Sequence, residues 1–222
     1  MAKRKRPVNQ ELESFHEMPR RFKLNGSQER ACRAIREHPV SVLLGNAGCG
    51  KSFAALYMAR EMLQSRQIER IAIVRSPLEI SRAQIGFLGG DLSQKLEPWA
   101  AASRCIGKEL GIEDALEFVY LGHIQGMTFT DTMVIVEECQ SLTLAEFEAV
   151  VTRLGLGSYM VFTGDPLQDI KRSGGLLPFV HAVRHVEGVA IVQFDPKDNQ
   201  RHPIIRNICN ALWGDQPDLS NI

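Results

Sequence analysis

One glycine-rich segment has the residue types and spacing of a phosphate-binding loop. Residues 45–52 read Gly-Asn-Ala-Gly-Cys-Gly-Lys-Ser and lie between an apolar run and an amphipathic stretch. Glycines let the backbone turn tightly, so that successive N–H groups point at phosphate oxygens, and the helix that follows adds its partial positive end. The segment therefore predicts a loop that binds a nucleoside triphosphate. The residues expected to contact it are Gly45, Asn46, Ala47, Gly48, Cys49, Gly50, Lys51, Ser52 and Phe53.

Two side chains at the end of this loop could take part in chemistry. Lys51 would bring a full positive charge to the β- and γ-phosphates, and the Ser52 hydroxyl could ligate Mg²⁺. The sequence thus predicts ATP and Mg²⁺ as cofactors. Cys49 has two interpretations: the cationic helix end could favour its thiolate, or it is simply a small residue that fits the loop.

Two adjacent acids follow a second apolar run. Glu137 and Glu138 come directly after Met133-Val-Ile-Val. We expect Glu137 to hold Mg²⁺, directly or through water, and Glu138 to orient and polarise the attacking water as general base. Adjacent strand residues point to opposite faces, so the two roles should differ. The alternative is an acidic strand end that faces solvent, which the phosphate loop disfavours.

A polar residue follows the next apolar run. The chain continues from 159–163 into Gly-Asp-Pro-Leu-Gln168. Gln168 could reach the γ-phosphate of a bound nucleotide and report its presence. Taken alone, the Gly-Asp-Pro segment is typical of an ordinary turn.

These residues need a scaffold, and the apolar pattern predicts one. Strands are expected at 40–44, 71–74, 133–136, 159–163 and 189–194, with a further short strand at 118–121. Helices are expected at 27–38, 51–65, 92–110, 143–154 and 174–185, and after Pro203 to about 213, with Ser27 as the N-cap of the first. Alternating strands and helices indicate a parallel, doubly wound sheet. The segment 78–130 is long for one crossover, and we expect it to be an insertion or a working loop region.

Composition limits the classes of protein that remain. The 222 residues fit one α/β domain, and 26 basic residues balance 26 acidic ones, so no whole-surface charge favours nucleic acid. A local basic patch at Lys3-Arg-Lys-Arg6 is open to two interpretations, a nucleic-acid contact or a solubilising end. Five cysteines without a CxxC pair favour reduced thiols and a cytoplasmic location. No apolar run is long enough to cross a membrane, and no hydrophobic segment follows the basic start, so no signal peptide is expected.

In combination, the motifs resemble the PhoH-like family, whose ATPase core is similar to the first motor domain of superfamily 1 helicases. The resemblance covers about residues 24–206. The motifs that carry it are Asn25-Gly-Ser-Gln28, residues 45–52, Arg75-Ser-Pro, Gly86-Phe-Leu-Gly-Gly-Asp-Leu92, Val136-Glu-Glu-Cys-Gln140, Thr152-Arg-Leu-Gly155, Gly164-Asp-Pro-Leu-Gln168 and Asn199-Gln-Arg-His-Pro203.

This resemblance implies a fold and a division of the chain. The fold is a P-loop NTPase of the α/β class, RecA-like, with three α/β/α layers and a mostly parallel central sheet. A basic, polar arm would occupy 1–24, the ATPase domain 25–213 and a tail 214–222. The compact length also suits phage-encoded members, for which the cytoplasm would be that of the host.

The resemblance also implies roles for single residues. Gln28 would read the adenine edge and favour ATP. Arg75 and Ser76 match a segment that faces the nucleic-acid strand in helicases, and Gln168 would couple the γ-phosphate to that face.

An arginine at the γ-phosphate is implied as well. Arg201 matches one that comes from the same chain or from a neighbour, and Arg172 and Arg153 are weaker candidates. Because a helicase has two motor domains and this chain has room for one, we expect a homo-oligomer, such as a ring, that places a neighbour beside each ATP site.

Two departures from the family pattern bear on activity. Glu137 stands where the family usually has Asp, and Ile-Gln-Gly-Met precedes Thr128 where arginines usually flank the glycine. The leading hypothesis is a Mg²⁺-dependent ATPase coupled to single-stranded RNA or DNA. A helicase or translocase proper, and an ATP-dependent switch with little hydrolysis, remain alternatives. A small-molecule kinase is disfavoured, because no arginine-rich lid is found.

Overall fold

The computed structural model describes residues 22–75, 92–169, 174–199 and 204. These residues form one sheet of six strands, all paired in parallel in the order β3-β2-β4-β5-β1-β6. The strands are β1 (Val40–Leu44), β2 (Arg70–Arg75), β3 (Leu116–Tyr120), β4 (Thr132–Val136), β5 (Tyr159–Gly164) and β6 (Val189–Gln193). The prediction of a doubly wound parallel sheet is confirmed, and β3 is the additional short strand.

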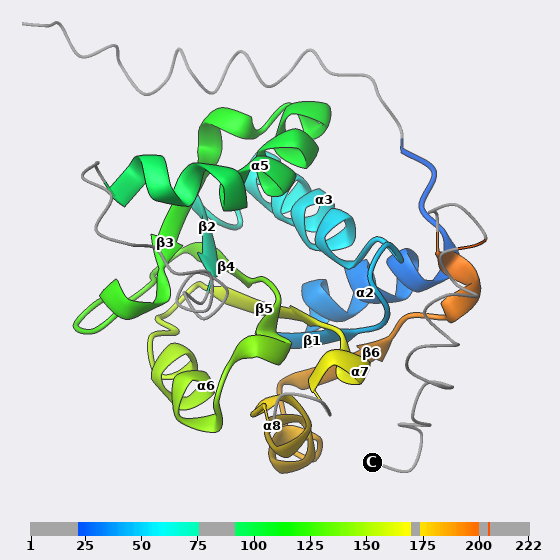
Figure 1. Ribbon diagram of the computed structural model, residues 1–222. Coiled ribbons are helices and arrows are strands. Elements are labelled where there is room, and N and C mark those ends of the chain that lie inside the picture. The colour runs from blue at the N-terminus through cyan, green and yellow to red at the C-terminus, as the bar shows by residue number, and fades with distance from the viewer. Residues whose placement is uncertain (1–21, 76–91, 170–173, 200–203, 205–222) are drawn as a thin grey trace, which may run out of the picture.

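Helices cover both faces of this sheet, which gives three α/β/α layers (Figure 1). One face packs against α2 (Gly26–Glu37), α3 (Lys51–Gln64) and α5 (Leu92–Leu110), and the other against α6 (Leu144–Val151) and α8 (Leu176–Val183). Short elements connect these layers: α7 (Pro166–Asp169), η2 (Glu113–Ala115), η3 (Leu121–His123), η4 (Cys139–Ser141) and η5 (Pro196–Asp198).

Each strand contributes to two cores because its side chains alternate. In β2, Ile71 and Ile73 join the core under α2, α3 and α5, whereas Ala72 and Val74 join the core under α6 and α8. Strands buried on both faces need consecutive apolar residues, which is why uninterrupted apolar runs located them in the sequence.

The first helix begins earlier than predicted. Asn25, not Ser27, is its N-cap: the Asn25 side chain accepts from the Gln28 N–H at 2.9 Å, and the Gln28 side chain accepts from the Asn25 N–H at 3.0 Å. This reciprocal capping box satisfies two amide donors at the helix start. The Ser27 hydroxyl instead accepts from Arg30 at 2.7 Å and from the N–H of Asp195 at 3.1 Å.

Two later helices are shorter than the predicted ranges 143–154 and 174–185. After α6 the chain pairs with the residues that precede β4, because the N–H of Phe129 donates to the Arg153 carbonyl at 2.9 Å and the N–H of Gly155 donates to the Phe129 carbonyl at 2.7 Å. A Cβ at Gly155 would collide with that carbonyl. This tertiary pairing ends the helix at Val151, and local periodicity does not report it.

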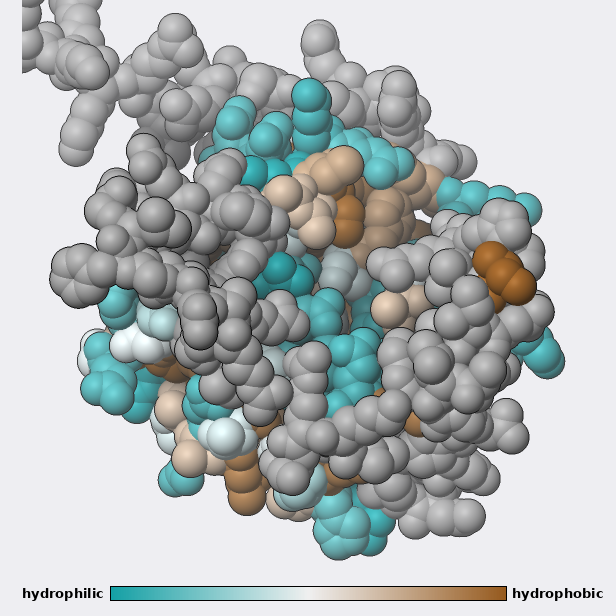
Figure 2. All heavy atoms as spheres, in the orientation of Figure 1, coloured by the Kyte–Doolittle hydropathy of each residue, from teal (hydrophilic) through white to brown (hydrophobic). Residues whose placement is uncertain are grey.

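The surface, the helices and the cysteines of the described residues bear on three further expectations. On the face seen in Figure 2, its hydrophobic residues occur in small groups between hydrophilic ones. No helix among the described residues is long and apolar enough to cross a bilayer. Cys32, Cys49 and Cys139 are buried and Cys105 is exposed, and none of these four described cysteines is in a disulfide.

Several sequence-based expectations fall outside the described residues. They concern most of the arm at 1–24, including the basic patch, as well as Ser76, the glycines at 86–90, Arg172, Arg201, the helix after Pro203 and the tail 214–222.

Candidate active site

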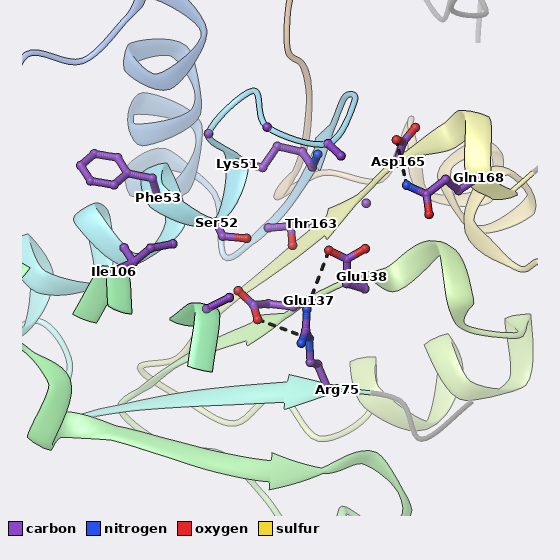
Figure 3. A pocket seen from close by; sticks show the side chains of 15 residues that line it. Lys51, Ser52, Phe53, Arg75, Ile106, Glu137, Glu138, Thr163, Asp165 and Gln168 are labelled. Carbon is purple, nitrogen blue, oxygen red and sulfur yellow. Dashed lines mark hydrogen bonds and ion pairs between the residues drawn. The ribbon is translucent and has the colours of Figure 1, made fainter. Parts of the chain in front are cut away.

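A pocket of about 280 Å³ lies at the carboxyl ends of the central strands. It is lined by the loop between β1 and α3, by the ends of β2, β4 and β5, and by one side of α5. Open parallel sheets offer their ligand site at this edge, because the loops that leave the strands there diverge to either face. Figure 3 shows the side chains that point into the pocket.

The glycine-rich loop folds around the ammonium group of its own lysine. Lys51 Nζ donates to the carbonyl of Gly45 at 2.6 Å and to that of Asn46 at 3.0 Å. Gly48 and Gly50 have φ angles of 87° and 88°, a left-handed conformation that only glycine adopts at no steric cost. This backbone path is what a phosphate-binding loop requires.

The predicted loop residues divide into two groups. Those that line the pocket are Ala47, Gly48, Gly50, Lys51, Ser52 and Phe53. The other three, Gly45, Asn46 and Cys49, are not among the lining residues. Asn46 is 4% exposed and Cys49 is 1% exposed, and a Cβ at Gly45 would crowd the Cys49 sulfur. These three residues pack on the side of the loop that faces away from the pocket lining, and so support its conformation.

Cys49 is a neutral packing residue. Burial raises the pKa of its thiol, and the nearby Lys51 charge offsets this only in part. The thiolate interpretation is therefore disfavoured, and the small residue that fits the loop is the better description.

The two acids lie side by side but not as adjacent residues of a regular strand. Glu137 follows the last residue of β4 and its side chain is 4% exposed, whereas that of Glu138 is 45% exposed. The expectation of opposite faces is wrong. Glu138 has φ 52° and ψ 40°, a left-handed conformation that breaks the strand alternation, so both carboxylates reach Arg75.

The buried acid has a second partner. The hydroxyl of Ser103, from α5, donates to Glu137 Oε2 at 2.7 Å. Ser103 is fully buried, so this bond fixes one oxygen of the carboxylate. No motif pointed to Ser103, because its approach depends on how α5 packs on the sheet.

A chain of side-chain amides joins the exposed acid to the predicted γ-phosphate sensor. Gln140 Nε2 donates to Glu138 Oε2 at 2.6 Å and to Gln168 Oε1 at 3.4 Å. Gln140 Oε1 accepts from the N–H of Asp165 at 3.0 Å, and Gln168 Nε2 donates to Asp165 Oδ2 at 3.1 Å. Gln168 lines the pocket and is held by the fully buried Gln140, whose role the sequence did not reveal. The role of Gln168 as a γ-phosphate sensor stays a prediction.

Gln28 lies directly behind the loop. It is 4% exposed, its Oε1 is engaged in the capping box with Asn25, and its Nε2 contacts Gly50 so closely that a Cβ there would collide with it. In this geometry Gln28 supports the loop. Its reading of the adenine edge stays a prediction.

Of the three arginines expected at the γ-phosphate, only Arg153 lies within the described residues. Arg201 and Arg172 lie outside the described residues. Arg153 bonds through its carbonyl to Phe129, at the amino-terminal edge of the sheet, and does not line the pocket. Asn199 donates from Nδ2 to the Ala47 carbonyl at 3.2 Å, which ties Asn199 to the loop.

The residues present fit a magnesium ion. The Ser52 hydroxyl and the Glu137 carboxylate line the same pocket, and both offer the hard oxygen ligands that Mg²⁺ prefers. Within the described part, no group of three His, Cys, Asp or Glu residues could hold a metal without help. Mg²⁺ usually takes one or two protein ligands together with substrate phosphates, so this sparse set is the expected kind.

The fold and the loop define a P-loop NTPase. The family model described as "PhoH-like protein" matches residues 23–213, so the chain belongs to the PhoH-like family. A PhoH-like protein of Synechocystis is 35% identical over 196 residues, covering 83% of this chain and 60% of that protein. One from Bacillus subtilis is 30% identical over 203 residues, covering 86% and 63%. The chain thus spans about 60% of the length of these curated relatives.

A solved structure supports the fold. The large terminase of a thermophilic bacteriophage, determined in complex with ADP, matches with a TM-score of 0.52 and 11% identity, covering 86% of this chain and 50% of that one. At this identity the likeness concerns the fold alone.

Proposed function

We propose that this chain is a Mg²⁺-dependent ATPase built on one RecA-like domain and coupled to single-stranded RNA or DNA. The observation that carries the proposal is that Lys51, at the start of α3, and Glu137 and Glu138, which follow β4, line one pocket (Figure 3). A bound Mg²⁺ would neutralise charge on the phosphate oxygens. Family membership supports nucleotide chemistry, and the ADP in the terminase structure is a property of that protein.

The chain's own residues would divide the work. Lys51, whose ammonium group donates to the Gly45 and Asn46 carbonyls in this structure, would bind the β- and γ-phosphates in their place. Ser52 and Glu137 would hold the ion. Glu138, whose carboxylate is half exposed and whose Oε2 is fixed by Gln140, would orient water.

Coupling between ATP hydrolysis and a bound nucleic-acid strand would pass through the side-chain amides of Gln140 and Gln168. Gln140 links Gln168 to Glu138 by hydrogen bonds. A displacement of Gln168 by the γ-phosphate would therefore alter the position of the Glu138 carboxylate, the proposed general base. We infer that a bound strand acts on hydrolysis along this path. A translocase or helicase proper would require movement on the strand in addition.

The test is an ATPase assay of wild type and Lys51→Ala, each with and without single-stranded RNA and DNA. We expect the variant to lose about a hundredfold or more in turnover, because preorganised charge at the phosphates is removed. Lys108→Ala, on the exposed side of α5, is the matched control and should retain full activity.

Each outcome decides between the candidates. Equal turnover in wild type and Lys51→Ala would contradict the ATPase proposal. Stimulation by strands that weakens with salt would support the coupling. Tight binding of ATP with negligible turnover under all conditions would favour the switch instead.

A further inference from the structure

A basic side chain stands at the end of the strand next to the two acids. Arg75 is the last residue of β2, and β2 pairs with β4 so that Val74 is aligned with Val136. The N–H of Glu137 donates to the Val74 carbonyl at 3.0 Å, which continues the ladder by one residue. Arg75 and Glu137 are thereby cross-strand neighbours, and Figure 3 shows the Arg75 side chain pointing to both acids.

One guanidinium is shared by two carboxylates. Arg75 Nε lies 3.5 Å from Glu137 Oε2, and Arg75 Nη2 lies 3.8 Å from Glu138 Oε1. The Arg75 side chain is 23% exposed and that of Glu137 is 4% exposed. An ion pair in such a setting is screened less by water and salt than one on the surface.

The distances rank the partners of Glu137. Ser103 donates to Glu137 Oε2 at 2.7 Å, the length of a strong hydrogen bond to a carboxylate. Arg75 approaches the same oxygen at 3.5 Å, well beyond the 2.7–2.9 Å of a charge-assisted hydrogen bond. Ser103 therefore orients the carboxylate, and Arg75 neutralises it without a tight bond.

A divalent cation and the Arg75 guanidinium would compete for the Glu137 carboxylate. Two like charges at one carboxylate repel each other, and the repulsion is larger where water is excluded. The guanidinium is the one that can give way, since its distance to the carboxylate is long and a flexible side chain carries it from the end of β2.

We propose that Arg75 is the resident counter-ion of the acid pair, which holds Glu137 in the nucleotide-free chain and competes with Mg²⁺ for it. The inference rests on the proposed function, because it takes Glu137 as the ligand of the ion. Arg75 acts here as a positioning residue: it keeps a buried carboxylate neutralised before the nucleotide arrives, and it sets the Mg²⁺ concentration at which the site fills.

The test compares wild type, Arg75→Gln and Arg153→Gln by thermal unfolding with a non-hydrolysable ATP analogue, first in EDTA and then over a Mg²⁺ titration. In EDTA, Arg75→Gln should unfold at a lower temperature, since Glu137 loses its counter-ion. Mg²⁺ should then stabilise this variant more than wild type, and half-saturation should need about threefold to tenfold less Mg²⁺. Arg153→Gln changes a residue at the amino-terminal ends of the strands, away from the pocket. It should match wild type in its unfolding temperature in EDTA and in the Mg²⁺ concentration at half-saturation.

A merely structural role would give a different pattern. If Arg75→Gln is destabilised equally in EDTA and in Mg²⁺, or needs the same or more Mg²⁺ than wild type, the inference is overturned. If wild type binds the analogue with no dependence on Mg²⁺, the proposed function falls and this inference with it.

A second measurement uses the wild-type chain, so it does not depend on how well a variant folds. The ¹⁵N resonance of Arg75 Nε–H in the wild-type chain should shift little when the analogue is added in EDTA and clearly when Mg²⁺ follows. A resonance that does not respond to Mg²⁺ in the presence of the analogue would overturn the inference.

Discussion

At the scale of single residues, Glu138 combines backbone strain with tight hydrogen bonding. Its left-handed conformation is uncommon for a residue with a side chain and costs about 1–2 kcal/mol. The Ser141 hydroxyl and N–H both donate to its carbonyl, at 2.8 and 3.0 Å, and Gln140 holds its carboxylate. Strain that the surroundings impose in this way is concentrated at functional positions, where it places a group that regular structure would point elsewhere.

Removing the charge of this residue should separate binding from turnover. Glu138→Gln keeps the size of the side chain, so the turn and the loop should persist while the base is lost. We expect turnover to fall about a hundredfold to ten-thousandfold and the affinity for ATP to stay within about threefold. Steady-state hydrolysis and equilibrium binding of a fluorescent ATP analogue measure the two.

The matched control for this variant is Glu148→Gln, an exposed acid on α6 that is not part of the pocket. It should behave as wild type. If Glu138→Gln loses ATP binding to the same degree as turnover, the assignment of Glu138 as general base is wrong.

At the scale of elements, capping decides where the helices begin. Thr143 and Glu146 form a capping box at the start of α6, in which the Thr143 Oγ1 accepts from the Glu146 N–H at 3.3 Å and the Glu146 carboxylate accepts from the Thr143 N–H at 2.7 Å. α6 and α8 form one outer layer, and Phe147 of α6 stacks on Phe179 of α8 with ring centroids 4.3 Å apart. The start of α6 thus fixes a core contact.

Thr143→Ala should lower the free energy of unfolding by about 1 kcal/mol, because an amide donor at the helix start loses its acceptor. Urea denaturation would measure the change. Thr143→Ser retains a hydroxyl and should stay within about 0.5 kcal/mol of wild type. A loss in Thr143→Ser equal to that in Thr143→Ala would show that the methyl group, and not the cap, carries the effect.

The packing of α2 on α3 should give the stability a dependence on alkaline pH. Burial raises the pKa of the Cys32 thiol from 9.0 to about 11. Between these values the folded chain keeps a proton that the unfolded chain loses, so this thiol's contribution to stability is complete below about pH 9 and is lost as pH rises toward about 11.

Cys32→Ala removes that titration. Between about pH 8.5 and 10.5, the variant should lose less free energy of unfolding than wild type, as measured by urea denaturation at each pH. Cys105→Ala, in which an exposed thiol is removed, should show the wild-type dependence. Identical losses in wild type and Cys32→Ala would contradict the prediction.

Elements with a strong local signal were predictable, and those set by distant contacts were not. The six strands follow from apolar runs, and α5 follows from its amphipathic period with the predicted ends, 92 and 110. The N-cap at Asn25 was missed although the pair Asn25–Gln28 is visible in the sequence. The end of α6 depends on pairing with Phe129, and Ser103 reaches Glu137 through tertiary packing, so neither leaves a local pattern.

At the scale of the whole molecule, the pocket lies at the carboxyl ends of the strands of the one sheet that the described residues form. The loop, the acids and Gln168 line it, whereas the arginine expected at the γ-phosphate, Arg201, lies outside the described residues. We propose that a second copy of the chain faces each site, as the second motor domain does in the helicases that the family resembles.

This proposal predicts a change of mass with nucleotide. Light scattering of the Glu138→Gln variant should show a larger particle with ATP and Mg²⁺ than without them, because a variant that does not turn over keeps the nucleotide in place. Rapid hydrolysis by a wild-type chain that stays monomeric under the same conditions would contradict it.

The position of β1 has a consequence for the order in which the protein is made. β1 carries the phosphate loop at its end, yet both of its partners come much later in the chain: Val40 is aligned with Met160 of β5 and with Val189 of β6. A nascent chain on the ribosome therefore exposes the hydrogen-bonding edges of β1 until nearly all of the domain has emerged. Strand pairing over such separations is slow, and unpaired edges invite association with other chains. Competence to bind nucleotide should consequently arise only after β5 and β6 have been made, and β1 is the segment that a chaperone would have most reason to cover.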